Sequence, residues 1–173
     1  YKMKRLYLIL FCFFFIFIFT TFYLSLKNNK IYDTENLIGK EIKYIELQFF
    51  NDEKKFSTTD AKNFNFTLFN FWASWCGPCR KEHKHLISLS KINNLKIIGV
   101  NFKDDKNNAK NFLKELGNPF FILTQDPDGK KSVDFGVYGI PETILVDENL
   151  TILKKYIGPL KPKDVKEIKK IVN

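Results

Sequence analysis

The chain has 173 residues, of which 45% are hydrophobic, and carries a formal net charge of +9. This length allows one buried core, and therefore one globular domain with short additions. A nucleic-acid-binding protein is not indicated, because several cations flank one apolar segment and the remaining lysines are scattered along the predicted helices.

The first predicted element is an uncharged apolar run at residues 6–26, made mainly of Phe, Ile and Leu. A helix of about 20 such residues can cross a bilayer. The apolar part of a cleaved signal peptide usually has about 7–15 residues and is followed by a small-x-small site, which this run lacks. We therefore predict a transmembrane anchor, with Cys12 as an apolar residue that faces lipid.

The charges around the anchor predict its orientation. Three cations precede the run and two follow it: Lys2, Lys4 and Arg5, then Lys27 and Lys30. Because positive residues are favoured on the cytoplasmic side of a membrane, we predict a cytoplasmic tail at residues 1–5. A linker at 27–36 and a domain at 37–173 would then lie outside the cytoplasm.

The predicted domain opens with two strands, 42–50 and 55–56, around a polar turn, a pattern that indicates a β-hairpin. The next run, residues 65–72, is apolar and aromatic with polar residues on both sides, as is typical of a buried central strand. From Pro78 onward, apolar residues recur at helical spacing and predict an amphipathic helix.

Two thiols lie between that strand and that helix, in the stretch Trp75-Cys76-Gly77-Pro78-Cys79. Proline is suited to a first helical turn, because its nitrogen needs no intrahelical partner there. Cys76 is thus predicted at a helix N-terminus, where free amides and the helix dipole favour a thiolate. We predict that an exposed Cys76 attacks disulfides and that Cys79, which faces the core, resolves the mixed disulfide.

Two other interpretations of the thiols are a structural disulfide and a zinc site completed by His83 and His85. The disulfide would close too short a loop to constrain the unfolded chain much. The zinc site would lack a second Cys-x-x-Cys, and the helical phase turns His85 away from Cys79. The sequence therefore favours a dithiol redox centre that holds neither a metal nor a cofactor.

Strands and helices alternate through the rest of the domain. The predicted elements are a strand at 95–102, a helix at 107–116, a strand at 120–123, a short helix at 130–135, a hairpin of strands 143–146 and 151–157, and a helix at 163–172. Since the predicted domain contains only the two thiols of the motif, its fold does not depend on a disulfide framework.

This order of elements around Cys-Gly-Pro-Cys resembles the thioredoxin fold over roughly residues 37–172. Three stretches, residues 72–83, 99–105 and 134–143, further resemble the membrane-anchored CcmG/DsbE thiol:disulfide interchange proteins of cytochrome c biogenesis. The resemblance implies an α/β domain with a central mixed sheet flanked by helices, an N-terminal β-hairpin extension and a single preceding transmembrane helix.

The resemblance also implies a substrate platform opposite the dithiol. The bond between Ile140 and Pro141 would be cis, and the backbone of Ile140 would pair with a bound peptide by strand addition. An ordinary proline turn at the start of a strand is the alternative. The implied substrate-binding set is Trp75, Gly77, Pro78, Gly139, Ile140, Pro141 and Glu142.

A proton acceptor for the second thiol is a separate question. Thioredoxins place a buried aspartate six residues before the first cysteine, where this chain has Asn70, which cannot take up a proton. The helical phase puts Glu82 on the core side, where desolvation raises a carboxyl pKa. We predict that Glu82 accepts the proton of Cys79, with Glu142 as a second candidate. A surface carboxylate that pairs with lysine is the alternative for Glu82.

The resemblance implies a thiol:disulfide oxidoreductase anchored in the bacterial inner membrane, with its catalytic domain in the periplasm. Its role would be to keep the haem-binding cysteines of apocytochrome c, or of a partner dithiol maturation protein, reduced. Electrons would come from a transmembrane thiol carrier of the CcdA or DsbD type, since the compartment is oxidising. A general envelope reductase of the ResA or TlpA type, a dithiol oxidase and a non-catalytic docking scaffold remain alternatives.

Overall fold

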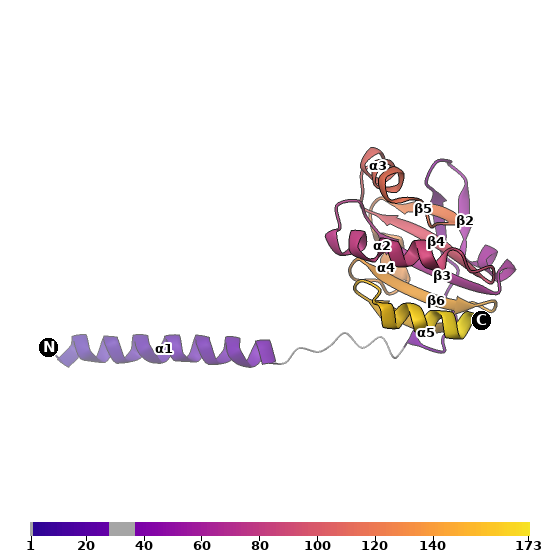
Figure 1. The fold of residues 1–173 in the computed structure, drawn as a ribbon. Coiled ribbons are helices and arrows are strands. Elements are labelled where there is room, and N and C mark those ends of the chain that lie inside the picture. Colours follow the sequence, from indigo (N-terminus) through magenta and orange to yellow (C-terminus); the bar gives the residue numbers. More distant parts are fainter. Residues whose placement is uncertain (1, 28–36) are drawn as a thin grey trace. The chain divides into compact units, whose positions relative to one another are not determined.

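A computed structural model describes residues 2–27 and 37–173. The chain divides into two compact units, residues 1–36 and 37–173, which are drawn in Figure 1. The predicted linker falls outside the described residues, apart from Lys27 at its start.

The described residues of the first unit form helix α1 (Lys2–Lys27). Its segment Met3–Ser25 is long and apolar enough to cross a membrane. The hydroxyls of Thr20 and Thr21 donate to backbone carbonyls three and four residues earlier, so these polar groups find partners within the helix. By length and composition α1 is suited to a membrane anchor, and a signal sequence would have the same properties.

Seven strands of the second unit form one mixed sheet in the order β2-β1-β5-β4-β3-β6-β7. The central strands β3, β4 and β5 are parallel, and each of the others is antiparallel to its neighbours. The strands are β1 (Glu46–Phe49), β2 (Lys55–Ser57), β3 (Phe66–Trp72), β4 (Leu95–Phe102), β5 (Ile122–Asp126), β6 (Glu142–Asp147) and β7 (Ile152–Ile157). Trp72 pairs with Asn101, so β3 and β4 end at the same edge.

Helices cover both faces of this sheet. Figure 1 shows α2 and α5 in front of the sheet and α4 behind it. The helical elements are η2, a 3-10 helix (Thr58–Asn63), α2 (Gly77–Leu89), α3 (Lys106–Leu116), α4 (Lys130–Asp134) and α5 (Pro162–Val172). Leu86, Phe112 and Ile168, from α2, α3 and α5, belong to one buried cluster, and Phe135 at the end of α4 belongs to the other. The sheet therefore separates two hydrophobic cores.

Aromatic side chains pack around Trp72, the last residue of β3, in the first core. The Trp72 ring stacks on Phe120 at 5.3 Å and contacts Phe112 at 5.1 Å. Gly99 in β4 leaves room for this stack, because a Cβ there would lie 2.6 Å from the Phe120 ring. The aromatic packing thus fixes the point at which the chain leaves the sheet toward α2.

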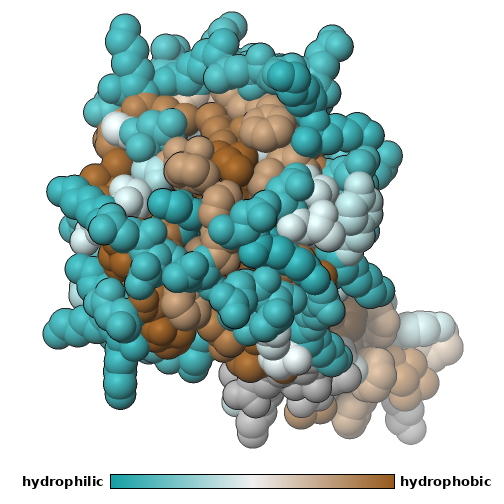
Figure 2. Space-filling view, turned by 90° about the vertical axis from the view of Figure 1, so that its right-hand side faces the viewer, coloured by the Kyte–Doolittle hydropathy of each residue, from teal (hydrophilic) through white to brown (hydrophobic). Residues whose placement is uncertain are grey.

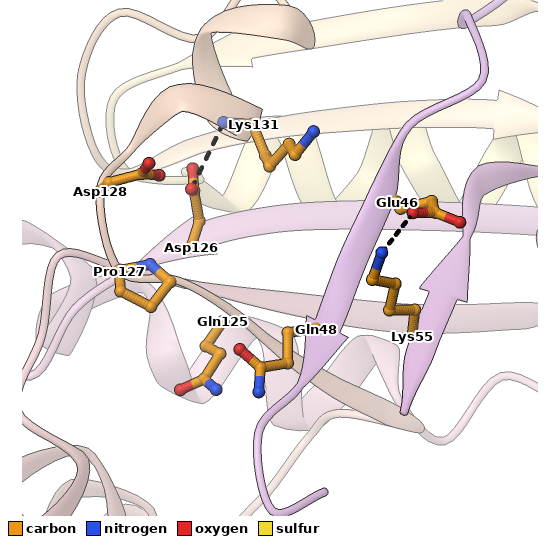
Figure 3. Close-up of a pocket in the computed structure, with 8 residues that line it drawn as sticks. All are labelled: Glu46, Gln48, Lys55, Gln125, Asp126, Pro127, Asp128 and Lys131. Atoms are coloured by element: carbon orange, nitrogen blue, oxygen red, sulfur yellow. Dashed lines mark hydrogen bonds and ion pairs between the residues drawn. The ribbon is translucent and has the colours of Figure 1, made fainter. Parts of the chain in front are cut away.

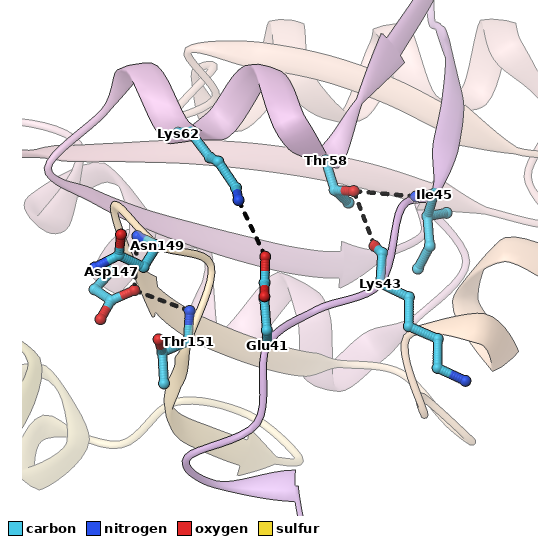
Figure 4. Close-up of polar contacts among 8 residues, drawn as sticks. All are labelled: Glu41, Lys43, Ile45, Thr58, Lys62, Asp147, Asn149 and Thr151. Carbon is cyan, nitrogen blue, oxygen red and sulfur yellow. Dashed lines mark hydrogen bonds and ion pairs between the residues drawn. The ribbon is translucent and has the colours of Figure 1, made fainter.

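The segment before β1 is held to two different elements (Figure 4). The hydroxyl of Thr58 accepts from the Ile45 amide and donates to the Lys43 carbonyl, while Lys62 forms a 3.0 Å ion pair with Glu41. Glu41 also forms a β-bridge with Thr151. These contacts fix the N-terminal extension to η2 and to the turn before β7.

The predicted architecture, a mixed sheet flanked by helices with a β-hairpin extension, is confirmed. Some bounds were wrong. The predicted strand 42–50 begins only at Glu46, because residues 42–45 bond to Leu150 and Thr58 at isolated positions and form no ladder with a neighbouring strand. The predicted strand 120–123 begins at Ile122 and continues to Asp126 beside β4.

Hydrophilic side chains cover much of the surface of this unit. On the face shown in Figure 2, hydrophobic side chains are exposed between them. Among the exposed apolar residues is Phe121, whose ring packs edge-on against Phe64 and lies under the Lys96 ammonium. Such contacts shield part of an exposed ring from water.

Candidate active site

The two cysteines of the motif form a disulfide where β3 gives way to α2. The Cα atoms of Cys76 and Cys79 are 5.3 Å apart. Cys76 is the N-cap of α2, and its sulfur accepts a hydrogen bond from the Cys79 amide at 3.2 Å. Pro78 lies in the first turn, as predicted. The Cys76 sulfur therefore lies at a helix N-terminus, where the Cys79 amide and the helix dipole favour negative charge.

The predicted exposure of Cys76 was wrong for this disulfide state. Only 4% of Cys76 and 2% of Cys79 is accessible. Both residues pack in the cluster that contains Trp72 and Ala73. Trp75, the residue directly before Cys76, is in contrast 59% exposed.

The loop before Cys76 is held by Asp104, which the sequence analysis did not single out. Its carboxylate accepts the Ser74 amide and hydroxyl, each at 2.6 Å, and the Asn101 side-chain amide at 2.9 Å. The indole of Trp75 donates to the carbonyl of Lys103 at 3.0 Å. The loop after β4 thus positions the residues directly before the first thiol.

Glu82 is buried on α2 one turn after Cys79, where its helical phase predicts it. It accepts the Asn70 side-chain amide at 2.9 Å and the Leu160 backbone amide at 2.7 Å. Burial raises the pKa of Glu82 to about 7, although these two hydrogen bonds oppose the shift. The carboxyl can therefore exchange a proton near neutral pH.

Asn70 links Glu82 to the neighbouring strand. Its side-chain amide also donates to the Thr143 hydroxyl at 3.0 Å, and Asn70 pairs with Thr143 in the sheet. Thioredoxins carry an aspartate at the position of Asn70. In this chain Asn70 instead donates a hydrogen bond to Glu82 on α2.

The proline loop, residues 136–141, leads into β6. The bond between Ile140 and Pro141 is cis, as the resemblance implies. Ile140 packs against the cluster that contains both cysteines. Gly139, which precedes it, has open space on its outer side, since a Cβ there would meet no atom within 4 Å.

Glu142 does not lie beside Cys79. Successive residues of a strand point to opposite faces of a sheet, and Thr143 points to the face that carries Asn70 and Glu82. The Glu142 side chain therefore points to the other face, where it accepts the amides of Tyr138 and Gly139. Its alternative role as proton acceptor for Cys79 is not supported by this arrangement.

His83, which was considered as a zinc ligand, has other partners in the structure. His83 is buried, and its Nε2 lies 2.9 Å from the Gly117 carbonyl oxygen. Its ring packs edge-on against Phe112, and burial lowers the pKa of His83. His83 thus joins α2 to the end of α3.

Two cavities lie near the edge of the sheet. One of about 300 Å³ opens between α3 and the loop that joins β3 to α2. It is lined by Ser74, Trp75, Arg80, Asn108, Asn111, Phe112 and Glu115. Another, of about 390 Å³, is lined by residues of β1, β2, the end of β5, the turn that follows it and α4. Figure 3 shows Gln48 and Gln125 side by side at that cavity, with the Glu46–Lys55 pair on one flank. The first cavity adjoins the dithiol loop directly.

Comparisons with known proteins agree with this geometry. Residues 37–172 match the Redoxin family. The chain is 44% identical over 124 residues to the thiol:disulfide interchange protein HelX of Rhodobacter capsulatus, with 72% of this chain and 70% of that protein covered. It is 40% identical over 128 residues to the thiol:disulfide interchange protein DsbE of Escherichia coli K12, with coverage of 73% and 69%. A solved thiol:disulfide interchange protein from Bacteroides superposes with a TM-score of 0.65 at 26% identity, covering 79% of this chain and 90% of that one.

Proposed function

We propose a specific role on the premise that this chain belongs to the Redoxin family and is a thiol:disulfide oxidoreductase of the DsbE type. The proposed role is that of a periplasmic reductant in cytochrome c maturation. Its substrates would be the haem-binding cysteines of apocytochrome c or of a dithiol maturation protein. The observation that carries the proposal is the Cys76–Cys79 disulfide at the N-terminus of α2, with buried Glu82 one turn later.

Reduction of a substrate proceeds in two exchange steps. The Cys76 thiolate attacks one sulfur of the substrate disulfide, a bond forms between them, and the second substrate sulfur leaves as a thiolate that takes up a proton. The Cys79 thiolate then attacks the Cys76 sulfur and releases the first substrate sulfur. The substrate gains two electrons, and the protein ends with the Cys76–Cys79 disulfide that the structure contains.

Glu82 serves the second step. Cys79 must lose its proton before it attacks, and its surroundings are buried. A carboxyl with a pKa of about 7 is ionised in part of the molecules at neutral pH and can accept that proton. The Asn70 and Leu160 amides hold the carboxylate in place for the transfer.

The proline loop supplies the peptide-binding platform. Ile140 contacts the cluster around the dithiol, and the space outside Gly139 is open. An extended peptide can then add to the backbone of Ile140 as a strand adds to the edge of a sheet. Trp75 is exposed directly before Cys76, so the attacked cysteine of the substrate would lie between Trp75 and the proline loop.

The anchor and the electron donor complete the proposal. Helix α1 would hold the protein in the inner membrane with residues 1–5 in the cytoplasm, in agreement with the excess of cations before it. Residues 27–36 would be a linker and residues 37–173 the catalytic domain. A transmembrane thiol carrier of the CcdA or DsbD type would reduce the Cys76–Cys79 disulfide after each turnover.

A trapping experiment tests the substrate. In a full-length Cys12→Ser background, Cys79→Ala removes the resolving thiol, so Cys76 should stay in mixed disulfides with its substrates. We expect apocytochrome c or a small dithiol maturation protein to dominate the captured set. The Cys76→Ser/Cys79→Ala variant is the control and should capture none of them. A captured set of unrelated envelope proteins would instead support a general reductase.

A further inference from the structure

The proline loop is tied to the sheet through a buried ion pair. The Lys155 ammonium in β7 lies 2.8 Å from the second carboxylate oxygen of Glu142, and the two side chains are 0% and 4% exposed. On the adjacent position of the same strand, Lys154 pairs with Glu167, but those side chains are 42% and 41% exposed. One strand thus offers a buried pair and an exposed pair side by side.

The buried pair contacts the loop at three backbone groups. Glu142 accepts the Tyr138 amide at 3.1 Å and the Gly139 amide at 3.0 Å with its first oxygen. The Lys155 ammonium donates to the Gly136 carbonyl. Lys155 therefore acts on the loop both directly and through Glu142.

The loop is exposed on its outer side and held on its inner side. Tyr138 is 68% exposed, and nothing lies within 4 Å of the position of a Cβ on Gly139. Glycine allows many backbone conformations, so a loop with Gly136 and Gly139 needs outside contacts to hold one of them. The Lys155–Glu142 pair provides these contacts from beneath.

Stability alone is a poor explanation for such a pair. Removing two charges from water costs free energy that their attraction often does not recover, and apolar residues of similar volume often stabilise a fold equally well. An apolar pair, however, could not bind two amides and a carbonyl at defined positions. The chemistry of the pair therefore matches the task of positioning backbone.

We propose that Lys155 is a positioning residue for peptide substrates. Through Glu142 and the Gly136 carbonyl it holds residues 138–140 where a peptide can add to the backbone of Ile140. This inference rests on the proposed function, because it assigns the loop to substrate binding. The proposed role of Lys155 distinguishes peptide disulfides from small disulfides, since a small disulfide without flanking peptide does not bind to the loop.

The test compares two disulfides with the reduced full chain in detergent. One is a short peptide closed by a Cys-x-x-Cys disulfide with flanking residues, and the other is 2-hydroxyethyl disulfide. For Lys155→Met we expect the rate constant with the peptide to fall about tenfold or more, because small displacements of a binding group have large effects. The rate with 2-hydroxyethyl disulfide should stay unchanged. Lys155→Arg should restore the peptide rate, and the control Lys154→Met should leave both rates unchanged.

Glu142→Gln gives a second variant should Lys155→Met fail to fold. It keeps the oxygen that binds the Tyr138 and Gly139 amides but removes the charge beside Lys155, and it should also lower the rate with the peptide alone. Equal losses with both disulfides, or full peptide rates in Lys155→Met or Glu142→Gln, would overturn the role of Lys155. A wild-type protein that reduces neither disulfide would contradict the proposed function itself.

Discussion

At the scale of single residues, Glu82 is the group whose chemistry depends most on its surroundings. Glu82 is 1% exposed, and burial raises the pKa of its carboxyl from 4.5 to about 7. The helical phase predicts this placement, because the period of a helix is set locally. The partners Asn70 and Leu160 could not be predicted in this way, because they lie on other elements. Asn70 is 12 residues earlier in the chain and Leu160 is 78 residues later.

We expect Glu82→Gln to slow resolution of the mixed disulfide by about 10²-fold, since glutamine keeps the size of the side chain but cannot take up a proton. The change should also remove the dependence of resolution on a group that titrates near pH 7. Stopped-flow reduction of a model disulfide between about pH 5 and 9, followed by tryptophan fluorescence, measures both effects. Coincident pH profiles for wild type and variant would show that Glu82 does not handle this proton.

The same substitution predicts a stability effect with a defined sign. Because the folded pKa of Glu82 lies above its unfolded value of 4.5, the native state binds more protons between pH 4.5 and 7. The contribution of Glu82 to stability is therefore present at low pH and is lost as the pH rises through about 7. Relative to Glu82→Gln, the wild type should lose about 3 kcal/mol of unfolding free energy across this interval. Denaturant unfolding at pH 4.5 and pH 8 measures the difference.

At the scale of elements, two loops are each held by a carboxylate: the loop directly before Cys76, and the proline loop, whose Ile140 packs against the cluster that contains both cysteines. Asp104 binds the Ser74 amide and hydroxyl before α2, and Glu142 binds the amides of Tyr138 and Gly139 before β6. The strands and helices could be predicted because their hydrophobic periods are local. The hydrogen bonds of Asp104 and Glu142 to these loops could not be predicted, since each depends on which strands pair and in what register. Asp104 could have been noticed only because it lies in one of the stretches that carry the family resemblance.

We expect Asp104→Ala to free the loop before Cys76. Loss of hydrogen bonds to a charged group should cost about 1.5–3 kcal/mol of unfolding free energy and slow the attack of Cys76 on disulfides. The rate of a single turnover with a model disulfide measures the second effect. Asp105→Ala is a matched control, because Asp105 caps α3 through the Asn107 and Asn108 amides. It should lower stability by about 1 kcal/mol without slowing the attack; equal slowing by both variants would contradict a specific role for Asp104.

At the scale of the whole molecule, one redox domain follows one apolar helix. Composition and length were enough to predict this division, since an apolar run of this kind has no place in a small soluble core. The extended segment 42–45 was predicted as part of a strand because its apolar alternation does not reveal which partner its amides meet. Orientation in a membrane follows only from flanking charge and stays a prediction.

That orientation can be measured by thiol labelling. In a Cys12→Ser background, a membrane-impermeant maleimide should label the cysteines of the domain in intact spheroplasts after mild reduction, because the domain is predicted outside the cytoplasm. Salt washing should leave the protein in the membrane fraction, since an apolar span is held by the hydrophobic effect. Labelling that requires cell lysis would place the domain on the cytoplasmic side.

The most direct measurement of the central claim is the direction of electron transfer with a peptide that carries the Cys-x-x-Cys-His sequence of a haem-binding site. The reduced full chain, in a Cys12→Ser background, is mixed with the oxidised peptide, and the oxidised full chain is mixed with the reduced peptide. Free thiols on each partner are then counted at equilibrium. We predict that the peptide ends reduced in both mixtures while Cys76 and Cys79 end as the disulfide seen in the structure. A peptide that ends oxidised in both mixtures would show that the protein introduces disulfides, and would contradict its assignment as a reductase.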